Sequence, residues 1–179
     1  MPTFSRSQLL LTLAITAVVL LAIAQVWRNV AGIDLAFQWS WVAFAEGIGL
    51  GCFLSACSFA LYQLWPAYRE SAAQYMQLII APLQMGDWLW LGLLPGLSEE
   101  LLFRGVMLPS WGLVPTSVLF GLLHVLDWRQ WPYALWTTII GLAFGVATLV
   151  SGNLLVAVTA HVVVNWISCW IWGRMPREA

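Results

Sequence analysis

The residues best suited to chemistry lie in three short motifs in the second half of the chain. They are E-E-x-x-x-R at Glu99, Glu100 and Arg104, F-x-x-x-H at Phe120 and His124, and H-x-x-x-N at His161 and Asn165. Carboxylates and imidazoles can move protons, and imidazole or amide N–H groups can donate hydrogen bonds to a developing oxyanion. Glu99, His124 and His161 also supply the two-histidine, one-glutamate ligand set of many catalytic zinc sites.

Helical spacing predicts which side chains of these motifs pair with each other and which stay free. Glu100 and Arg104 are i,i+4 neighbours, so we expect them to pair on one face of a helix. Glu99 lies about 100° round that helix from Glu100 and has no such partner, which leaves its carboxylate free to act. His161 and Asn165 share one face in the same way and can point into a common cavity.

Each motif taken alone has an ordinary structural explanation, either a salt-bridged helix in water or a satisfied core histidine. Here the surrounding segments are apolar, and a charge at the centre of a membrane helix costs roughly 2.5 to 3.5 kcal/mol on insertion scales. Charged residues kept at such a cost are functional by default. The three motifs together therefore predict a working site inside the membrane.

The composition supports a membrane location. The chain has 179 residues, of which 61% are hydrophobic and only 8% charged, about a third of the charge that soluble domains carry. A soluble globular protein is therefore excluded. The seven basic residues are all Arg and the net charge is −1, so nucleic-acid binding is not expected.

The predicted fold is all-α, a polytopic transmembrane helix bundle. A bilayer core of about 30 Å needs roughly 17 to 25 apolar residues per helix, and we predict about six spans plus an interfacial or re-entrant segment. The fourth span is short for a full crossing. The predicted spans are 9–26, 41–64, 88–107, 114–127, 133–150 and 154–172.

These segments define four parts of the chain. Residues 1–70 form two N-terminal helices, 71–86 an interfacial segment, 87–173 a catalytic core of four helices, and 174–179 a polar tail. The first helix resembles a secretory signal, but its long apolar run favours an uncleaved anchor. The positive-inside rule predicts that both termini are cytoplasmic. That orientation puts Arg28 outside and these five arginines inside: Arg6, Arg69, Arg129, Arg174 and Arg177.

The predicted span boundaries also give depths. Counted from the outer boundary at about 1.5 Å per residue, the four polar candidates lie roughly 10 to 17 Å into the membrane. We therefore expect one cavity near mid-membrane that contains Glu99, His124, His161 and Asn165.

In residue type, order and spacing, the three motifs resemble the signature blocks of the CPBP family. This family comprises the CAAX prenyl proteases and the bacteriocin-processing enzymes, also called the Abi family. The similarity covers roughly residues 87 to 172, about half of the chain. It implies an intramembrane endopeptidase that acts on a membrane-associated peptide or protein and is surrounded by membrane lipid.

The resemblance supports a mechanism without a required cofactor. Glu99 and His124 would activate water, His161 and Asn165 would stabilise the oxyanion, and Glu100 would pair with Arg104 as support. Zinc held by Glu99, His124 and His161 is the alternative, although the H-E-x-x-H motif is missing. A non-catalytic scaffold, an immunity protein or a transport subunit with a proton relay stays open as a second class.

Overall fold

Helices make up the computed structural model, which describes residues 4–125 and 127–174, and no strand occurs in that part of the chain. A sharp turn, a π-helical turn and two short 3₁₀ turns interrupt the longer helices. The predicted all-α class is confirmed. The elements are α1 Arg6–Ala31, α2 Trp41–Leu64, α3 Pro66–Ile80, η1 Met85–Asp87, α4 Trp88–Leu102, η2 Phe103–Met107, α5 Leu108–Trp111, α6 Leu113–Leu122, η3 Trp128–Gln130, α7 Trp131–Ser151 and α8 Leu154–Trp172.

The number of complete spans is smaller than the predicted six. Four segments in the described residues are long and apolar enough to cross a membrane: α1, α2, Trp128–Ser151 and α8. A fifth is reached if α3 and the segment Met85–Trp111, bent by 99° relative to each other, count as one broken span or re-entrant loop. The predicted span 114–127 corresponds to α6, whose 10 residues extend only about 15 Å, half of a bilayer core. The chain is an integral membrane protein with fewer full crossings than its hydropathy alone predicts.

Local sequence explains where helices begin and end. Ser5 caps α1 in a capping box, and the side chain of Asn153 accepts a hydrogen bond from Leu155 N at the start of α8. Pro66 begins α3 immediately after α2, at the helix position where its missing N–H costs nothing. The predicted interfacial segment 71–86 therefore covers the last part of α3, a turn and η1.

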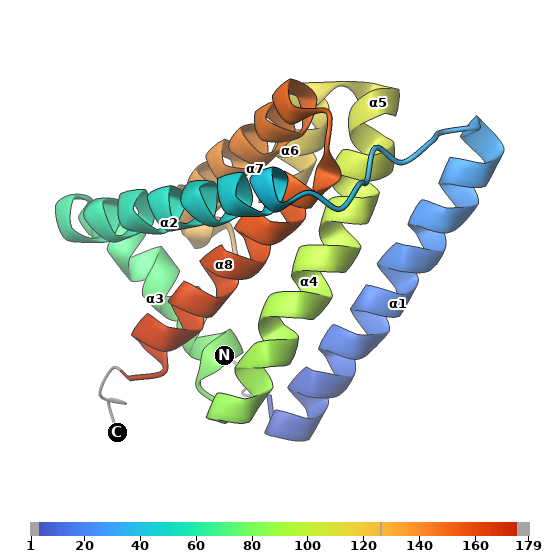
Figure 1. Cartoon of the computed structure of the whole chain (residues 1–179). Coiled ribbons are helices and arrows are strands. Elements are labelled where there is room, and N and C mark those ends of the chain that lie inside the picture. Colours follow the sequence, from blue (N-terminus) through green and yellow to red (C-terminus); the bar gives the residue numbers. More distant parts are fainter. Residues whose placement is uncertain (1–3, 126, 175–179) are drawn as a thin grey trace.

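Helix α8 is the centre of the bundle, with α2 and α4 packed on it (Figure 1). The G-x-x-x-G pair Gly47 and Gly51 of α2 faces α8 so closely that a Cβ on Gly47 would lie 2.7 Å from the carbonyl oxygen of Val156. On α4, a Cβ on Gly96 would come within 2.6 Å of Val162 Cγ2. Small residues allow this close approach of helices, which carries much of helix association in lipid.

The two ends of the described chain lie at the same end of the molecule (Figure 1). Arg6, at the start of α1, forms a bidentate ion pair with Asp87, just before α4, at 2.7 Å. Gly173, after α8, packs against Trp88, the first residue of α4. The predicted polar tail, residues 174–179, lies outside the described residues except for Arg174, and Arg177 is therefore not described.

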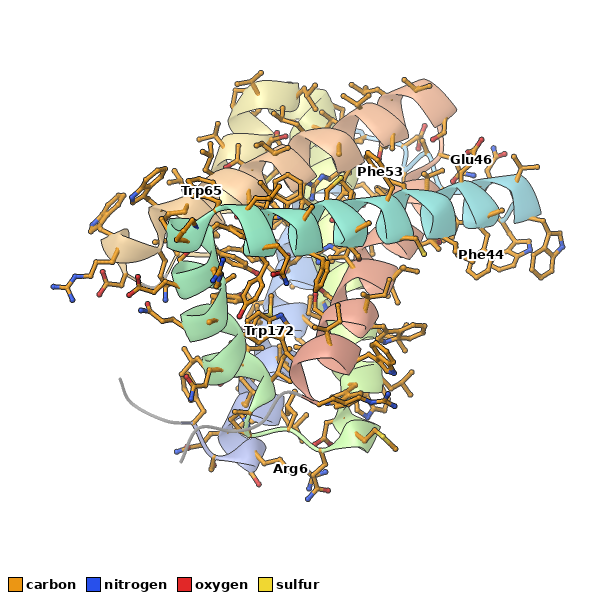
Figure 2. All side chains as sticks on the ribbon, turned by 90° about the vertical axis from the view of Figure 1, so that its left-hand side faces the viewer. Arg6, Phe44, Glu46, Phe53, Trp65 and Trp172 are labelled. Carbon is orange, nitrogen blue, oxygen red and sulfur yellow. The ribbon has the colours of Figure 1, made fainter. Side chains whose placement is uncertain are left out.

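The outside of the bundle is apolar, as a lipid-facing surface requires. Val30 and Val150 are more than four-fifths exposed, and exposed aromatic residues gather at helix ends, where amphipathic rings suit the headgroup layer. Trp39, Trp41 and Phe44 form one such cluster at the start of α2. Figure 2 shows Phe44 near one end of α2 and Trp65 at the other.

Candidate active site

The structure brings the four predicted catalytic residues to one cavity of about 120 Å³. Glu99 comes from α4, His124 from the turn after α6, and His161 and Asn165 from α8. At roughly 10 to 15 Å³ of such volume per water, the cavity holds several waters. The depth argument from the sequence therefore predicted this convergence, although its proposed span boundaries were only partly right.

Glu99 and His124 face each other across the cavity. Oε2 of Glu99 lies 3.7 Å from Nε2 of His124, and the two side chains are 16% and 19% exposed. This distance exceeds a direct hydrogen bond, and Oε2 of Glu99 is buried without a hydrogen-bond partner among the described residues. Two groups that accept hydrogen bonds across such a gap suit a water that donates to both.

The F-x-x-x-H spacing has a direct structural cause. Helix α6 ends at Leu122, so the carbonyl of Phe120 lies in the last turn, where carbonyls lack helical partners. Nδ1 of His124 fills that gap at 2.7 Å from the Phe120 oxygen. Because a carbonyl only accepts, Nδ1 carries a proton, and in the neutral form of the ring Nε2 would present its lone pair to Glu99.

A second, fully buried network lies behind the cavity. The guanidinium of Arg104 donates from Nη1 to Oε1 of Glu100 at 2.8 Å, and Nδ1 of His161 lies 2.8 Å from the same oxygen. Nη2 of Arg104 donates to the carbonyl of Gly141 at 2.9 Å. The predicted Glu100–Arg104 pair thus forms, and it also includes His161, which the sequence spacing did not reveal.

Arg104 lies in the π-helical turn η2 that joins α4 to α5. The N–H of Leu108 reaches back to the carbonyl of Phe103, one residue further than in an α-helix, and Pro109 follows without an N–H to donate. Such turns occur often at functional sites. The guanidinium is further covered by the ring of Phe120, whose centroid lies 4.3 Å from it.

A proline explains the position of Asn165. Pro95 interrupts α4 and has no N–H for the carbonyl of Leu91, four residues earlier. Nδ2 of Asn165 donates to that carbonyl oxygen at 3.3 Å. One N–H of the Asn165 amide therefore joins α8 to α4, and the second is available to the cavity that Asn165 lines.

The three candidate zinc ligands are Glu99, His124 and His161. In both histidines Nδ1 is engaged, with Phe120 or Glu100, so Nε2 would be the metal-binding nitrogen. Among residues 4–125 and 127–174, however, no three His, Cys, Asp or Glu side chains are grouped closely enough to hold a metal ion. Glu99, His124 and His161 as they stand do not form a three-ligand zinc site.

Sequence reasoning missed three further polar residues of the cavity, Tyr75, Tyr133 and Ser168. Tyr75 of α3 and Tyr133 of α7 line it beside Glu99, with their rings stacked at 4.5 Å. Tyr75 belongs to the segment interpreted as interfacial, so no motif drew attention to it. Glu46 is exposed on α2, on the same helix as Phe44 and Phe53 (Figure 2), and does not line the cavity.

Comparisons with known proteins agree with the motifs. Residues 80–167 match a family model described as "Type II CAAX prenyl endopeptidase Rce1-like". "Uncharacterized protein YpbD" of Bacillus subtilis (strain 168) is 26% identical over 119 residues, which cover 66% of this chain and 63% of that protein. The chain thus spans less than two thirds of this relative's length. No solved structure matches the chain significantly. The matched region contains Glu99, Glu100, Arg104, His124, His161 and Asn165.

Proposed function

We propose that this chain, which belongs to the Rce1-like family of type II CAAX prenyl endopeptidases through residues 80–167, is an intramembrane endopeptidase. Its substrate would be a membrane-associated peptide or protein whose scissile bond enters the cavity between α4 and α8. The observation that carries the proposal is the pair of facing acceptors, Glu99 Oε2 and His124 Nε2, 3.7 Å apart in a cavity shared with His161 and Asn165.

The first step is attack by water on the scissile carbonyl. A water that donates one hydrogen to Glu99 and one to His124 has its oxygen lone pair directed into the cavity. As its oxygen bonds to the carbonyl carbon, the carboxylate of Glu99 takes its proton, and the carbonyl oxygen becomes an oxyanion. Collapse of this intermediate breaks the C–N bond, and the proton held by Glu99 passes to the departing amine.

The oxyanion needs hydrogen-bond donors in the same cavity. The second N–H of the Asn165 amide is one such donor, and loss of a single donor costs about 10²- to 10³-fold in kcat in a soluble protease. His161 donates from Nε2 only as an imidazolium, because Nδ1 is bound to Glu100.

The favoured mechanism uses the side chains of this chain alone, and the zinc version is the alternative. Metal would supply a Lewis acid and a more acidic water if Glu99, His124 and His161 moved together as ligands. Metal analysis of the purified protein and a chelator titration separate the two. We expect cleavage to persist after chelation, and loss of cleavage that zinc restores would favour the alternative.

Substitution of Glu99 tests the proposed function. The assay uses protein purified in detergent and an internally quenched peptide that ends in a farnesylated CAAX sequence. Glu99→Gln keeps the shape of the side chain but removes the base, so we expect cleavage to fall to background while insertion and the unfolding temperature are kept. Glu46→Gln is the matched control, because Glu46 is exposed on α2 and outside the cavity.

The same assay separates an enzyme from a scaffold. Cleavage by the wild type and by Glu46→Gln, with none by Glu99→Gln or His124→Ala, supports the endopeptidase. Near-normal turnover by Glu99→Gln would defeat the proposed mechanism. Absence of wild-type cleavage, together with a cellular phenotype that His124→Ala leaves unchanged, would favour a non-catalytic membrane protein.

A further inference from the structure

The proposed mechanism leaves three polar residues of the cavity unused, Tyr75, Tyr133 and Ser168, and Tyr75 is the one whose ring lies near His124. Tyr75 lies in the second half of α3. Its ring stacks on that of Tyr133 with the two centroids 4.5 Å apart, and its centroid lies 6.3 Å from the centroid of the His124 ring. It lines the cavity together with Glu99 and Asn165. Because the family match begins at residue 80, Tyr75 belongs to none of the motifs that define the site.

The hydroxyl of Tyr75 has no hydrogen-bond partner among the residues that the structure describes. Tyr75 is partly buried, and a tyrosine O–H without a protein partner is available to donate to a group bound beside it. The other α3 residues of the cavity are Met76, Ile79 and Ile80, none of which has a polar side chain. The negative charge of Glu99 acts on the Tyr75 phenol electrostatically, so the donor and the proposed base belong to one polar site.

The other donors of the cavity are partly committed. One N–H of Asn165 goes to the carbonyl of Leu91, and Nδ1 of His161 is bound to Glu100. If His161 is neutral, the cavity offers a single N–H to the oxyanion, and its other donors are the hydroxyls of Tyr75, Tyr133 and Ser168. Of these three, Tyr75 has its ring in contact with the His124 ring, with centroids 6.3 Å apart. Two or more donors are usual in oxyanion holes. A phenol O–H is a donor at neutral pH, because its ordinary pKa is about 10.

We infer that Tyr75 is a further catalytic residue, which donates a hydrogen bond from its phenol to the oxyanion formed on the scissile carbonyl. This inference rests on the proposed endopeptidase function. The proton stays on the phenol throughout, and no bond to Tyr75 forms or breaks. Helix α3 therefore contributes to the chemistry as well as covering the cavity.

Tyr75→Phe removes the hydroxyl and keeps the ring that stacks on Tyr133. We expect kcat for the farnesylated peptide to fall about 100-fold, as for loss of one oxyanion donor, with little change in KM. A phosphinate analogue of the same peptide, which mimics the tetrahedral intermediate, should bind more weakly by a similar factor. A non-cleavable ground-state peptide should bind equally well to both proteins.

Tyr68→Phe is the matched control. Tyr68 is buried, and its ring also stacks on that of Tyr133, with the two centroids 6.4 Å apart. Tyr68 lines the neighbouring cavity, however, and not the cavity that contains Glu99. It should therefore cleave the peptide like the wild type. An equal loss of kcat in both variants would overturn the inference, because the stack of rings would then be what matters.

Incorporation of 3-fluorotyrosine at position 75 provides a readout that packing alone does not move. Fluorine makes the phenol a stronger hydrogen-bond donor and keeps its O–H, so the fluorinated protein should keep its kcat and bind the phosphinate at least as tightly as the wild type does. Wild-type kcat in Tyr75→Phe, or a loss of kcat in the fluorinated protein equal to that in Tyr75→Phe, would overturn the inference and leave the endopeptidase intact. If the wild type itself neither cleaves the peptide nor binds the phosphinate, the proposed function fails and the inference fails with it.

Discussion

Two adjacent glutamates have opposite surroundings in this structure. Glu100 is 0% exposed and is held by Arg104 and His161, whereas Glu99 faces the cavity with one oxygen unpaired in the described chain. Adjacent residues on a helix point about 100° apart, which is enough to put one carboxylate in the framework and the other in the cavity. This difference of one residue separates the proposed support role of Glu100 from the proposed catalytic role of Glu99.

Removal of the Glu100 charge should destabilise the protein. In Glu100→Gln the guanidinium of Arg104, 2% exposed, would remain buried without a counter-charge, a change that costs about 3 to 5 kcal/mol in buried pairs. Unfolding in mixed micelles measures the loss. The double variant Glu100→Gln with Arg104→Met should regain part of it, since both charges are gone. Wild-type stability of the single variant would contradict the proposed support role.

Much of the site could be predicted at the residue scale, because charge in an apolar segment is visible in any sequence. Spacing predicted the Glu100–Arg104 pair and the shared face of His161 and Asn165. The bond from His161 to Glu100, and that from Asn165 to Leu91, cross between α8 and α4. Contacts between distant segments leave no periodic signal, and the same limit hid Tyr75.

At the scale of elements, hydropathy predicted six spans, of which four are helices long and apolar enough to cross a membrane, and it overestimated the length of the span 114–127. Residues 114–127 are apolar throughout, yet α6 ends at Leu122. The side chain of His124 takes the Phe120 carbonyl that another helical turn would have used. Helix α3 begins earlier than the segment proposed for it, because Pro66 starts it and Arg69 donates to the carbonyls of Tyr62 and Gln63 at the end of α2.

Gly47 and Gly51 of α2 face α8, and Gly49 between them serves as a control for a prediction about helix packing. A Cβ at Gly47 or Gly51 would come within 2.7 Å or 2.8 Å of a carbonyl of α8, whereas a Cβ at Gly49 meets nothing within 4 Å. Gly47→Ala and Gly51→Ala should lower the unfolding free energy by about 1 to 3 kcal/mol through overpacking. Gly49→Ala should leave it unchanged or raise it slightly, as alanine favours helix.

Thermal unfolding of the three alanine variants in one detergent measures this difference. Equal stability of all three would mean that α2 does not pack on α8 through this face. Because α8 carries His161 and Asn165, we also expect the Gly47 and Gly51 variants to lose peptidase activity in proportion to their lost packing.

At the scale of the whole molecule, the described ends of the chain share one side. The Arg6–Asp87 ion pair ties the start of α1 to the start of α4, and Gly173 packs on Trp88 beside them. The Trp27–Trp111 contact and the hydrogen bond from Leu154 N to Ala36 O join segments at the other end. The Arg6–Asp87 ion pair at one end and the Trp27–Trp111 contact at the other suit a helix bundle whose two ends lie at the two membrane–water interfaces.

The orientation of the bundle is a prediction from charge. The six-span topology predicted from the sequence puts five arginines on the side of the termini and only Arg28 on the other, so we predict that both termini are cytoplasmic. Green fluorescent protein fused to either terminus should fluoresce, and alkaline phosphatase fused to either terminus should be inactive. Active phosphatase at one terminus only would mean an odd number of crossings, and active phosphatase at both would reverse the orientation.

The most direct test of the central claim is an experimental structure of the protein with a peptide phosphinate bound. The account predicts one phosphinate oxygen that accepts a hydrogen bond from protonated Glu99 and lies beside His124, where the attacking water would lie, and the other oxygen next to Asn165 and Tyr75. A phosphinate bound outside this cavity, or bound in it with Glu99 turned away from the tetrahedral centre, would contradict the account.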